Sequence, residues 1–199
     1  MTTVEFLRRL PKVQLHCHME VTLRASTFLD LAKRHGVALT YDPRAPKDAQ
    51  PSYEAVEANP ETLYRFADFQ QFLMTFAAVS RSLAAPEDYG RLAREYVEDA
   101  LAQNVAYAEV FISPSVWEFF HPEIDVHACV REMREAFDAK SEQIDVKLIA
   151  DLTRNFGVES GIRTAQIAVQ LQDLGVIGIG LGGDEARFPP ELFADVYAY

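Results

Sequence analysis

The sequence predicts an α/β fold built on parallel strands, and three observations support this class. Four short strand-like segments alternate along the chain with segments of helical periodicity. The later strand-like segments are largely apolar, as in strands that are covered on both faces. The order of strand, helices, strand, helix, strand, helix, strand and helix favours right-handed crossover connections between parallel strands.

The four expected strands are short and end at polar or turn-forming residues. The first alternates in side-chain character with period two, and the second ends at Ser113 and Pro114. Their expected ranges are 12–18, 105–112, 146–152 and 176–181.

The helices are expected from apolar residues that recur at steps of three and four. Gly36 suits the end of the first helix, and Pro86 suits the first turn of the third. Residues 41–60 contain four prolines and predict a long surface loop. The expected helices span 27–35, 61–82, 86–103, 125–141 and 160–174, and a last one starts near Pro189.

The composition limits the kinds of molecule that the protein is expected to bind. The 199 residues include 19 basic and 30 acidic side chains, a net charge of −11. Such a surface disfavours nucleic acid and anionic membranes, whereas a small neutral substrate remains compatible. No run approaches the ~20 apolar residues that span a bilayer, and the first residues do not resemble a secretory signal. Cys17 and Cys129 define no disulfide framework, so we expect a cytoplasmic protein.

The residues with the clearest chemical meaning are His16 and His18, at the end of the first strand. Residues two apart on a strand share a face, so both imidazoles can converge on one ion. Imidazole suits zinc, and catalytic zinc usually has three protein ligands and a water molecule. The spacing alone leaves a purely structural pair equally open.

Other polar and aromatic residues have mainly structural interpretations. We expect His35 to be a solvated residue at a helix end, and His121 and His127 to be structural. Asp151 and Arg154 lie at the end of the third strand, toward the expected pocket rim. For Arg154 we favour an ion pair that holds the barrel mouth, with the orientation of neighbouring acids as the alternative. The aromatic stripe of the helix at 61–82 is expected to be mostly core, with covering of a ligand as the alternative. This stripe comprises Phe69, Phe72, Leu73 and Phe76.

Three segments together resemble the adenosine deaminase family. Residues 10–20, LPKVQLHCHME, resemble its opening motif, L-P-K-x-E-L-H-x-H-L-[DE]-G. Residues 180–185, GLGGDE, resemble its G-x-x-G-D-E turn, and residues 107–114 resemble its second-strand motif. The motifs occur in the family's order and cover nearly the whole chain.

The resemblance implies a fold and a reaction. The fold would be the N-terminal half of a (β/α)8 TIM barrel, with four of the eight strands in one partial domain at 1–199. The reaction would be zinc-dependent hydrolytic deamination of a 6-aminopurine, most simply adenosine or deoxyadenosine to inosine and ammonia. The implied partner is a small purine nucleoside, and the implied cofactor is Zn2+.

The resemblance also implies roles for four residues. His16 and His18 would bind the metal, and His18 would also contact the substrate. Glu20 corresponds to the acid that contacts the ribose 5′-hydroxyl. Gly183 would offer its backbone amide to a purine ring nitrogen, where a glycine permits close approach.

Departures from the family pattern leave alternatives open. Val21 replaces a glycine, which predicts a different loop path or narrower access. Gln14 replaces a common glutamate, and Glu20 is the longer acid found in relatives that deaminate free adenine or other 6-aminopurine derivatives. Alternatives are therefore a deaminase of adenine or another 6-aminopurine, a different metal hydrolase on this barrel, or a non-catalytic half-barrel. Oligomeric state is not predicted.

The family's remaining catalytic motifs are absent from the printed sequence. No H-x-G-E segment occurs, although the resemblance implies one that carries the third zinc histidine and the proton-transferring glutamate. We therefore expect the general acid beyond Tyr199, no catalytic residue within 1–199, and an N-terminal fragment of the barrel.

Overall fold

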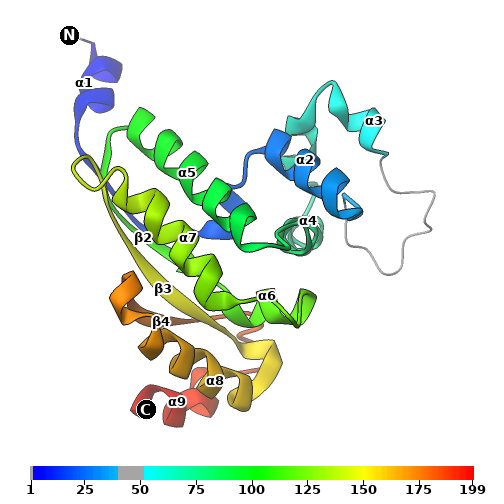
Figure 1. The fold of residues 1–199 in the computed structure, drawn as a ribbon, viewed down its shortest axis with the longest axis vertical. Coiled ribbons are helices and arrows are strands. Elements are labelled where there is room, and N and C mark those ends of the chain that lie inside the picture. The colour runs from blue at the N-terminus through cyan, green and yellow to red at the C-terminus, as the bar shows by residue number, and fades with distance from the viewer. Residues whose placement is uncertain (1, 40–51) are drawn as a thin grey trace.

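The computed structural model describes residues 2–39 and 52–199 and contains one parallel sheet of four strands (Figure 1). Most of the predicted loop, residues 41–51, lies outside the described residues. The strands lie in the order β1-β2-β3-β4, as the predicted α/β class requires. Their bounds are Lys12–His18 for β1, Val105–Ile112 for β2, Asp145–Thr153 for β3 and Val176–Gly182 for β4.

The register brings the carboxyl ends of the strands to the same edge. His18 of β1 pairs with Phe111 of β2, and Phe111 pairs with Ile149 of β3. Asp151 of β3 pairs in turn with Gly180 of β4. Side chains that follow or end these strands therefore meet above one edge of the sheet.

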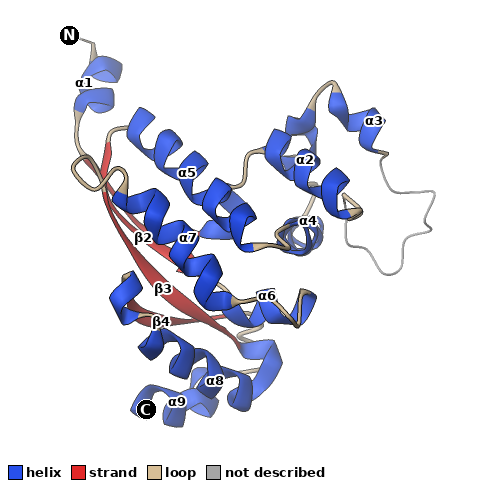
Figure 2. Ribbon diagram, in the orientation of Figure 1, coloured by secondary structure: helices blue, strands red, loops and turns tan. Residues whose placement is uncertain are grey.

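Three helices cover one face of the sheet (Figure 2). The residues of β2 and β3 that face these helices are buried, among them Val110, Leu148 and Ala150. The rings of Tyr89 and Trp117 meet in this core with centroids 4.4 Å apart. The covering helices are α5 at Pro86–Ala102, α7 at Val126–Asp138 and α8 at Gly157–Gln170.

The helices between β1 and α5 differ from the sequence prediction. The single helix expected over 61–82 is wrong, because Asp68 has an extended backbone and its side chain accepts a hydrogen bond from the Gln71 amide at 2.8 Å. This cap starts a new helix. The observed elements are α2 at Ala25–His35, α3 at Tyr53–Glu57, the 3-10 turn η3 at Pro60–Tyr64 and α4 at Phe69–Ser82.

A helix after β2 was not predicted from the sequence. Pro114 occupies the first turn of this helix, a position that proline favours, although the same residue also ends β2. The helix is α6 at Pro114–Phe120. The remaining elements are α1 at Thr3–Arg9, η1 at Met19–Thr22, η4 at Arg154–Phe156, η5 at Gln172–Leu174, η6 at Pro190–Phe193 and α9 at Ala194–Ala198.

A buried carboxylate joins α2 to the start of α5. The prediction that His35 is solvated is wrong, since its Nε2 lies 2.9 Å from Asp88 Oδ2. Asp88 is almost fully buried and also accepts hydrogen bonds from the amides of Ala84 and Ala85. Asp88 thus satisfies two amides at the start of α5 and fixes the end of α2 against it.

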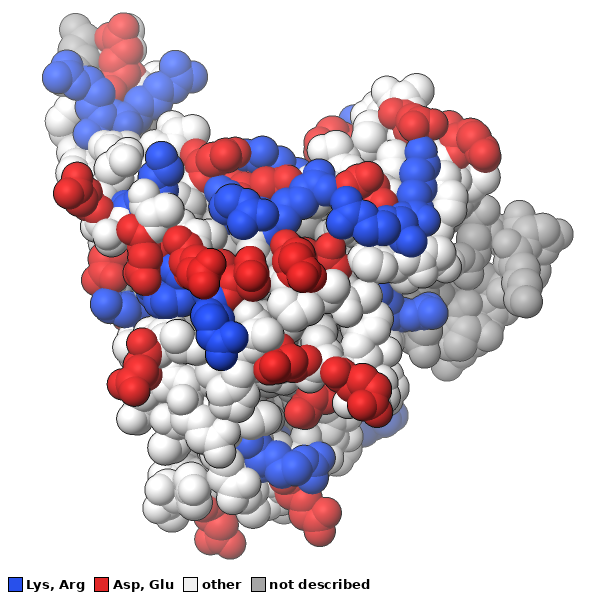
Figure 3. Space-filling model, viewed as in Figure 1, with Lys and Arg blue, Asp and Glu red and all other residues white. Residues whose placement is uncertain are grey.

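The surface carries both acidic and basic side chains, as the composition of the sequence predicts. On the face seen in Figure 3, acidic and basic side chains are interspersed over the covering helices. None of the described helices has the length and apolar character needed to cross a membrane.

We predict that Asp88→Ala lowers the free energy of unfolding by about 2–4 kcal/mol, because it leaves two amides and an imidazole without their acceptor. Urea denaturation at neutral pH measures the change. Asp138→Ala is the control, since the Asp138 side chain is 64% exposed in its ion pair with Arg134. That change should cost less than about 1 kcal/mol. Equal losses in both variants would contradict this assignment.

Candidate active site

A pocket of about 320 Å³ opens at the edge where the strands end. Its residues come from β1, β3 and β4, from the segments that follow them, and from α4 and α6. The polar lining groups face a wall of apolar side chains, as in sites for small organic ligands. The lining residues are His18, Val21, Phe72, Leu73, Phe76, Ser113, Val116, Asp151, Thr153, Asn155, Gly182 and Gly183.

The two histidines lie together at the end of β1. Their ring centroids are 5.5 Å apart, and both rings lie against Phe111, at 4.5 Å from His16 and 5.2 Å from His18. Burial lowers the pKa of His18, and nearby His16 lowers it further. Both effects favour the neutral imidazole, which is the form that binds a metal.

The residues present fit part of a zinc site. His16 and His18 lie close enough that both could offer a nitrogen ligand from one strand, and their metal-binding role stays a prediction. In residues 2–39 and 52–199, no group of three or more His, Cys, Asp or Glu side chains could hold a metal ion. Within the described residues, a metal held by the two histidines would therefore need further ligands from other groups.

Glu20 lies beneath the pocket and is fully buried in η1. Its Oε1 accepts hydrogen bonds from the Ser113 amide at 3.0 Å and from Trp117 Nε1 at 2.8 Å. Burial raises the pKa of this carboxyl, and the hydrogen bonds oppose the rise. Glu20 is not among the lining residues, so the ribose contact implied by the resemblance stays a prediction.

Val21 forms part of the pocket wall. The turn η1 accommodates it without left-handed backbone, since Asn104 is the one non-glycine residue with positive φ among those described. A glycine is therefore not needed here for backbone reasons. The Val21 side chain lines the pocket together with His18, and the narrower access expected from the sequence stays a prediction.

The turn after β4 requires glycine at position 183. Gly183 has φ of +105°, and a methyl group there would lie 2.5 Å from Asn155 Oδ1. That oxygen accepts a hydrogen bond from the Asp184 amide at 3.0 Å. Asn155 thus holds the turn that presents Gly183 to the pocket. The sequence analysis missed Asn155, because no motif marks it and only the fold brings η4 beside this turn.

Asp151 is a buried acid in the pocket. Burial raises the pKa of its carboxyl to about 7, Glu20 adds to the rise, and the Gly182 backbone and Arg154 oppose it. The ion pair expected for Arg154 at the rim joins it to Glu185, at 3.8 Å. Arg154 also donates a hydrogen bond to the Phe188 carbonyl oxygen at 2.8 Å.

The aromatic stripe of α4 lies at the pocket rather than in the core. Phe72, Leu73 and Phe76 line the cavity, and Phe69 is 72% exposed. The buried face of α4 is instead made of small side chains. The expectation that the stripe is mostly core is therefore wrong, and its alternative role beside a ligand fits the geometry. The buried residues of α4 are Thr75, Ala78, Val79, Ser80 and Ser82.

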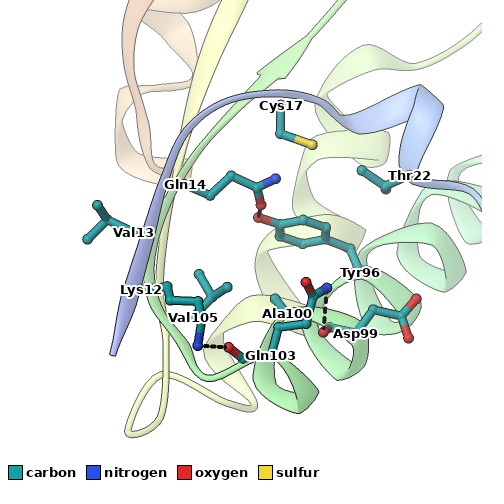
Figure 4. A pocket seen from close by; sticks show the side chains of 10 residues that line it. All are labelled: Lys12, Val13, Gln14, Cys17, Thr22, Tyr96, Asp99, Ala100, Gln103 and Val105. Carbon is teal, nitrogen blue, oxygen red and sulfur yellow. Dashed lines mark hydrogen bonds between the residues drawn. The ribbon is translucent and has the colours of Figure 1, made fainter. Parts of the chain in front are cut away.

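A second cavity, of about 360 Å³, lies at the other end of β1 against α5 (Figure 4). Although slightly larger, it contains no convergent histidines. Gln14 Oε1 accepts a hydrogen bond from the Tyr96 hydroxyl at 2.7 Å, and Lys12 donates one to the Gln103 carbonyl oxygen at 2.7 Å. Burial raises the pKa of the Cys17 thiol, which disfavours a reactive thiolate. Gln14 thus has a packing role here.

Comparison with known proteins defines the class. The sequence model of the adenosine deaminase family matches residues 11–199, and the chain belongs to this family. Adenine deaminase of Cupriavidus necator is 33% identical over 199 residues, which cover 98% of this chain and 51% of that protein. Adenine deaminase of Chlorobium phaeobacteroides is 29% identical, with coverages of 97% and 53%. The chain spans about half the length of these curated relatives.

Solved structures agree with the fold. Adenine deaminase of Arthrobacter aurescens has a TM-score of 0.73 at 27% identity, covering 94% of this chain and 53% of that one. An amidohydrolase of Burkholderia ambifaria with bound Zn has a TM-score of 0.74 at 29% identity, with coverages of 100% and 51%. The N6-methyl-AMP deaminase of Arabidopsis thaliana, at 22% identity and a TM-score of 0.74, supports the fold alone. The predicted half-barrel is thereby confirmed.

We predict that Asp151→Asn reduces the pH dependence of stability. The folded-state pKa, about 7, exceeds the ordinary value of 3.8, so the stabilising contribution is complete below pH 3.8 and is lost as pH rises through 7. Relative to the variant, the wild type should lose a few kcal/mol between about pH 4 and pH 8. Urea denaturation across this range measures it. Glu20 and His18 are present in both proteins, so their contributions are shared, and parallel profiles would refute the prediction.

Proposed function

We propose that this chain forms part of the active site of a zinc-dependent hydrolase that deaminates a 6-aminopurine, and that its substrate is the free base adenine. The observation that carries the choice of base is the full burial of Glu20, which does not line the pocket; its Oε1 accepts hydrogen bonds from Ser113 and Trp117, and its Oε2 has no partner among the described residues. A ribose 5′-hydroxyl would need an acceptor that faces the pocket. The names of the adenine deaminase relatives support the same choice.

The metal would be held by His16 and His18 together with ligands outside the described residues. Zinc bound there would supply an activated water near neutral pH. Phe111 packs against both rings and limits their rotation, so the pair is held ready for the ion. The general acid is proposed to lie beyond Tyr199, as expected from the family pattern.

The base would bind between apolar side chains and polar groups of the sheet edge. Phe72, Leu73 and Phe76 offer flat or broad apolar contacts from α4. On the opposite side, Gly183 is proposed to donate its amide to a purine ring nitrogen. His18 would lie next to the reacting amino group. Val21 narrows the pocket, which favours the smaller base over a nucleoside.

We predict that the full-length protein, loaded with zinc, deaminates adenine with a kcat/KM about 100-fold or more above that for adenosine, because Glu20, the acid that the resemblance assigns to the sugar, is buried and does not line the pocket. Ammonia release measured with both substrates decides the choice. Adenosine as the better substrate would overturn the proposed base while leaving the deaminase reaction intact.

We predict that His18→Ala abolishes both turnover and stoichiometric zinc binding, since it removes one ligand of the pair. His127→Ala is the matched control, because His127 lies on α7 away from the pocket and should leave both measurements unchanged. Zinc content determined by elemental analysis separates lost metal from lost folding, and a fully zinc-loaded His18→Ala protein would contradict the assignment.

We predict that the 199-residue polypeptide, studied by itself, binds zinc weakly and does not turn over adenine, since two histidines leave the ion under-coordinated. Isothermal titration with zinc and an ammonia assay test this. Tight binding of one zinc together with turnover would show that these residues suffice.

A further inference from the structure

We propose that Asp151 is a specificity-determining residue, whose carboxylate accepts a hydrogen bond from the ring N–H that a free purine base carries and a nucleoside lacks. This inference rests on the proposed function, because it concerns the same pocket and substrate class. It adds a residue of β3 to a site that the family resemblance places on β1 and on the turn after β4.

The placement of Asp151 is set by the sheet. It pairs with Gly180 on β4, and a methyl group at Gly180 would lie 2.7 Å from Asp151 Oδ1. A methyl group at Gly182 would also clash with this carboxylate. The carboxylate therefore leans over β4 into space that exists only because both positions are glycine. From there it lines the pocket beside Gly182 and Gly183.

The carboxyl is buried yet has few protein partners. Only 7% of Asp151 is exposed, and the Gly182 backbone forms a hydrogen bond with it. In the part of the chain that the structure describes, no side chain forms a hydrogen bond or ion pair with it, since Arg154 is engaged by Phe188 and Glu185. A buried acceptor with spare capacity that faces a cavity is suited to a ligand that brings a donor.

The groups beside Asp151 indicate which hydrogen-bond donor a ligand would bring to it. Gly183 is proposed to present an amide donor, and Asp151 presents an acceptor beside it. One edge of a free purine base offers the matching pair, an acceptor at N3 next to a donor N9–H. In a nucleoside, N9 carries the sugar and has no hydrogen. A carboxylate at this position would then favour the base and leave a nucleoside facing an unpaired buried acceptor.

The experiment compares adenine with 9-methyladenine, which keeps the 6-amino group and the ring acceptors but lacks N9–H. Binding to the full-length zinc protein is measured by calorimetry, and ammonia release is measured in parallel. The wild type is expected to favour adenine. Asp151→Asn and Asp151→Ser should each weaken adenine binding and kcat/KM by roughly 10- to 100-fold, with little change for 9-methyladenine.

Asp145→Asn is the matched control, because Asp145 is an exposed aspartate at the opposite end of the same strand, paired with Lys147. It should preserve the preference. Asp151→Ser guards against a folding defect specific to asparagine, and circular dichroism checks that each variant is folded.

The outcomes separate the two proposals. Adenine turnover with an unchanged preference in both folded Asp151 variants would overturn the role of Asp151 and leave the proposed function standing. Discrimination in binding that depends on Asp151, without turnover of either base, would support Asp151 and overturn the function. A wild type that neither binds nor deaminates adenine would overturn both.

Discussion

The site depends on one buried carboxylate, that of Glu20. Its Oε1 receives the Ser113 amide from the end of β2 and the Trp117 indole from α6, so three segments meet at one atom. An unpaired carboxylate in this environment would cost several kcal/mol, and the two donors to Oε1 offset part of that cost, while Oε2 has no hydrogen-bond partner among the described residues. Because Glu20 follows His18 by two residues, the same contacts also fix where β1 ends and where its histidines lie. Glu20 thus connects the segments around the pocket and is not itself among the lining residues.

A second constraint is the run of glycines on β4. Gly180 and Gly182 leave the space that the Asp151 carboxylate occupies, and Gly183 turns the chain with a positive φ that Asn155 supports. Side chains at these places would displace the acid or close the pocket. The polar side of the pocket is thus formed by the Asp151 carboxylate on β3 and by the backbone of β4, where the glycines leave space for it. The apolar side comes from α4, which belongs to a separate part of the sequence.

Local patterns were sufficient for the strands and for the histidine pair, because strand alternation and turn residues are encoded within a few positions. Local patterns failed where contacts between residues far apart in the sequence determine the structure. Asp68 breaks the aromatic segment into a turn and α4, and that break directs Phe72 and Phe76 toward the pocket instead of the core. His35 looked solvated at its helix end, yet Asp88, 53 residues away, binds it.

The sequence by itself determined the α/β class, the family and the likeness of His16 and His18 to a metal pair, since these follow from periodicity and short motifs. Tertiary structure decided the rest. It buried Glu20 under Trp117, brought Asn155 to the Gly183 turn and placed Asp151 over two glycines of β4. Burial and hydrogen bonding between distant segments are properties of the packed chain, so no local pattern could have assigned these residues.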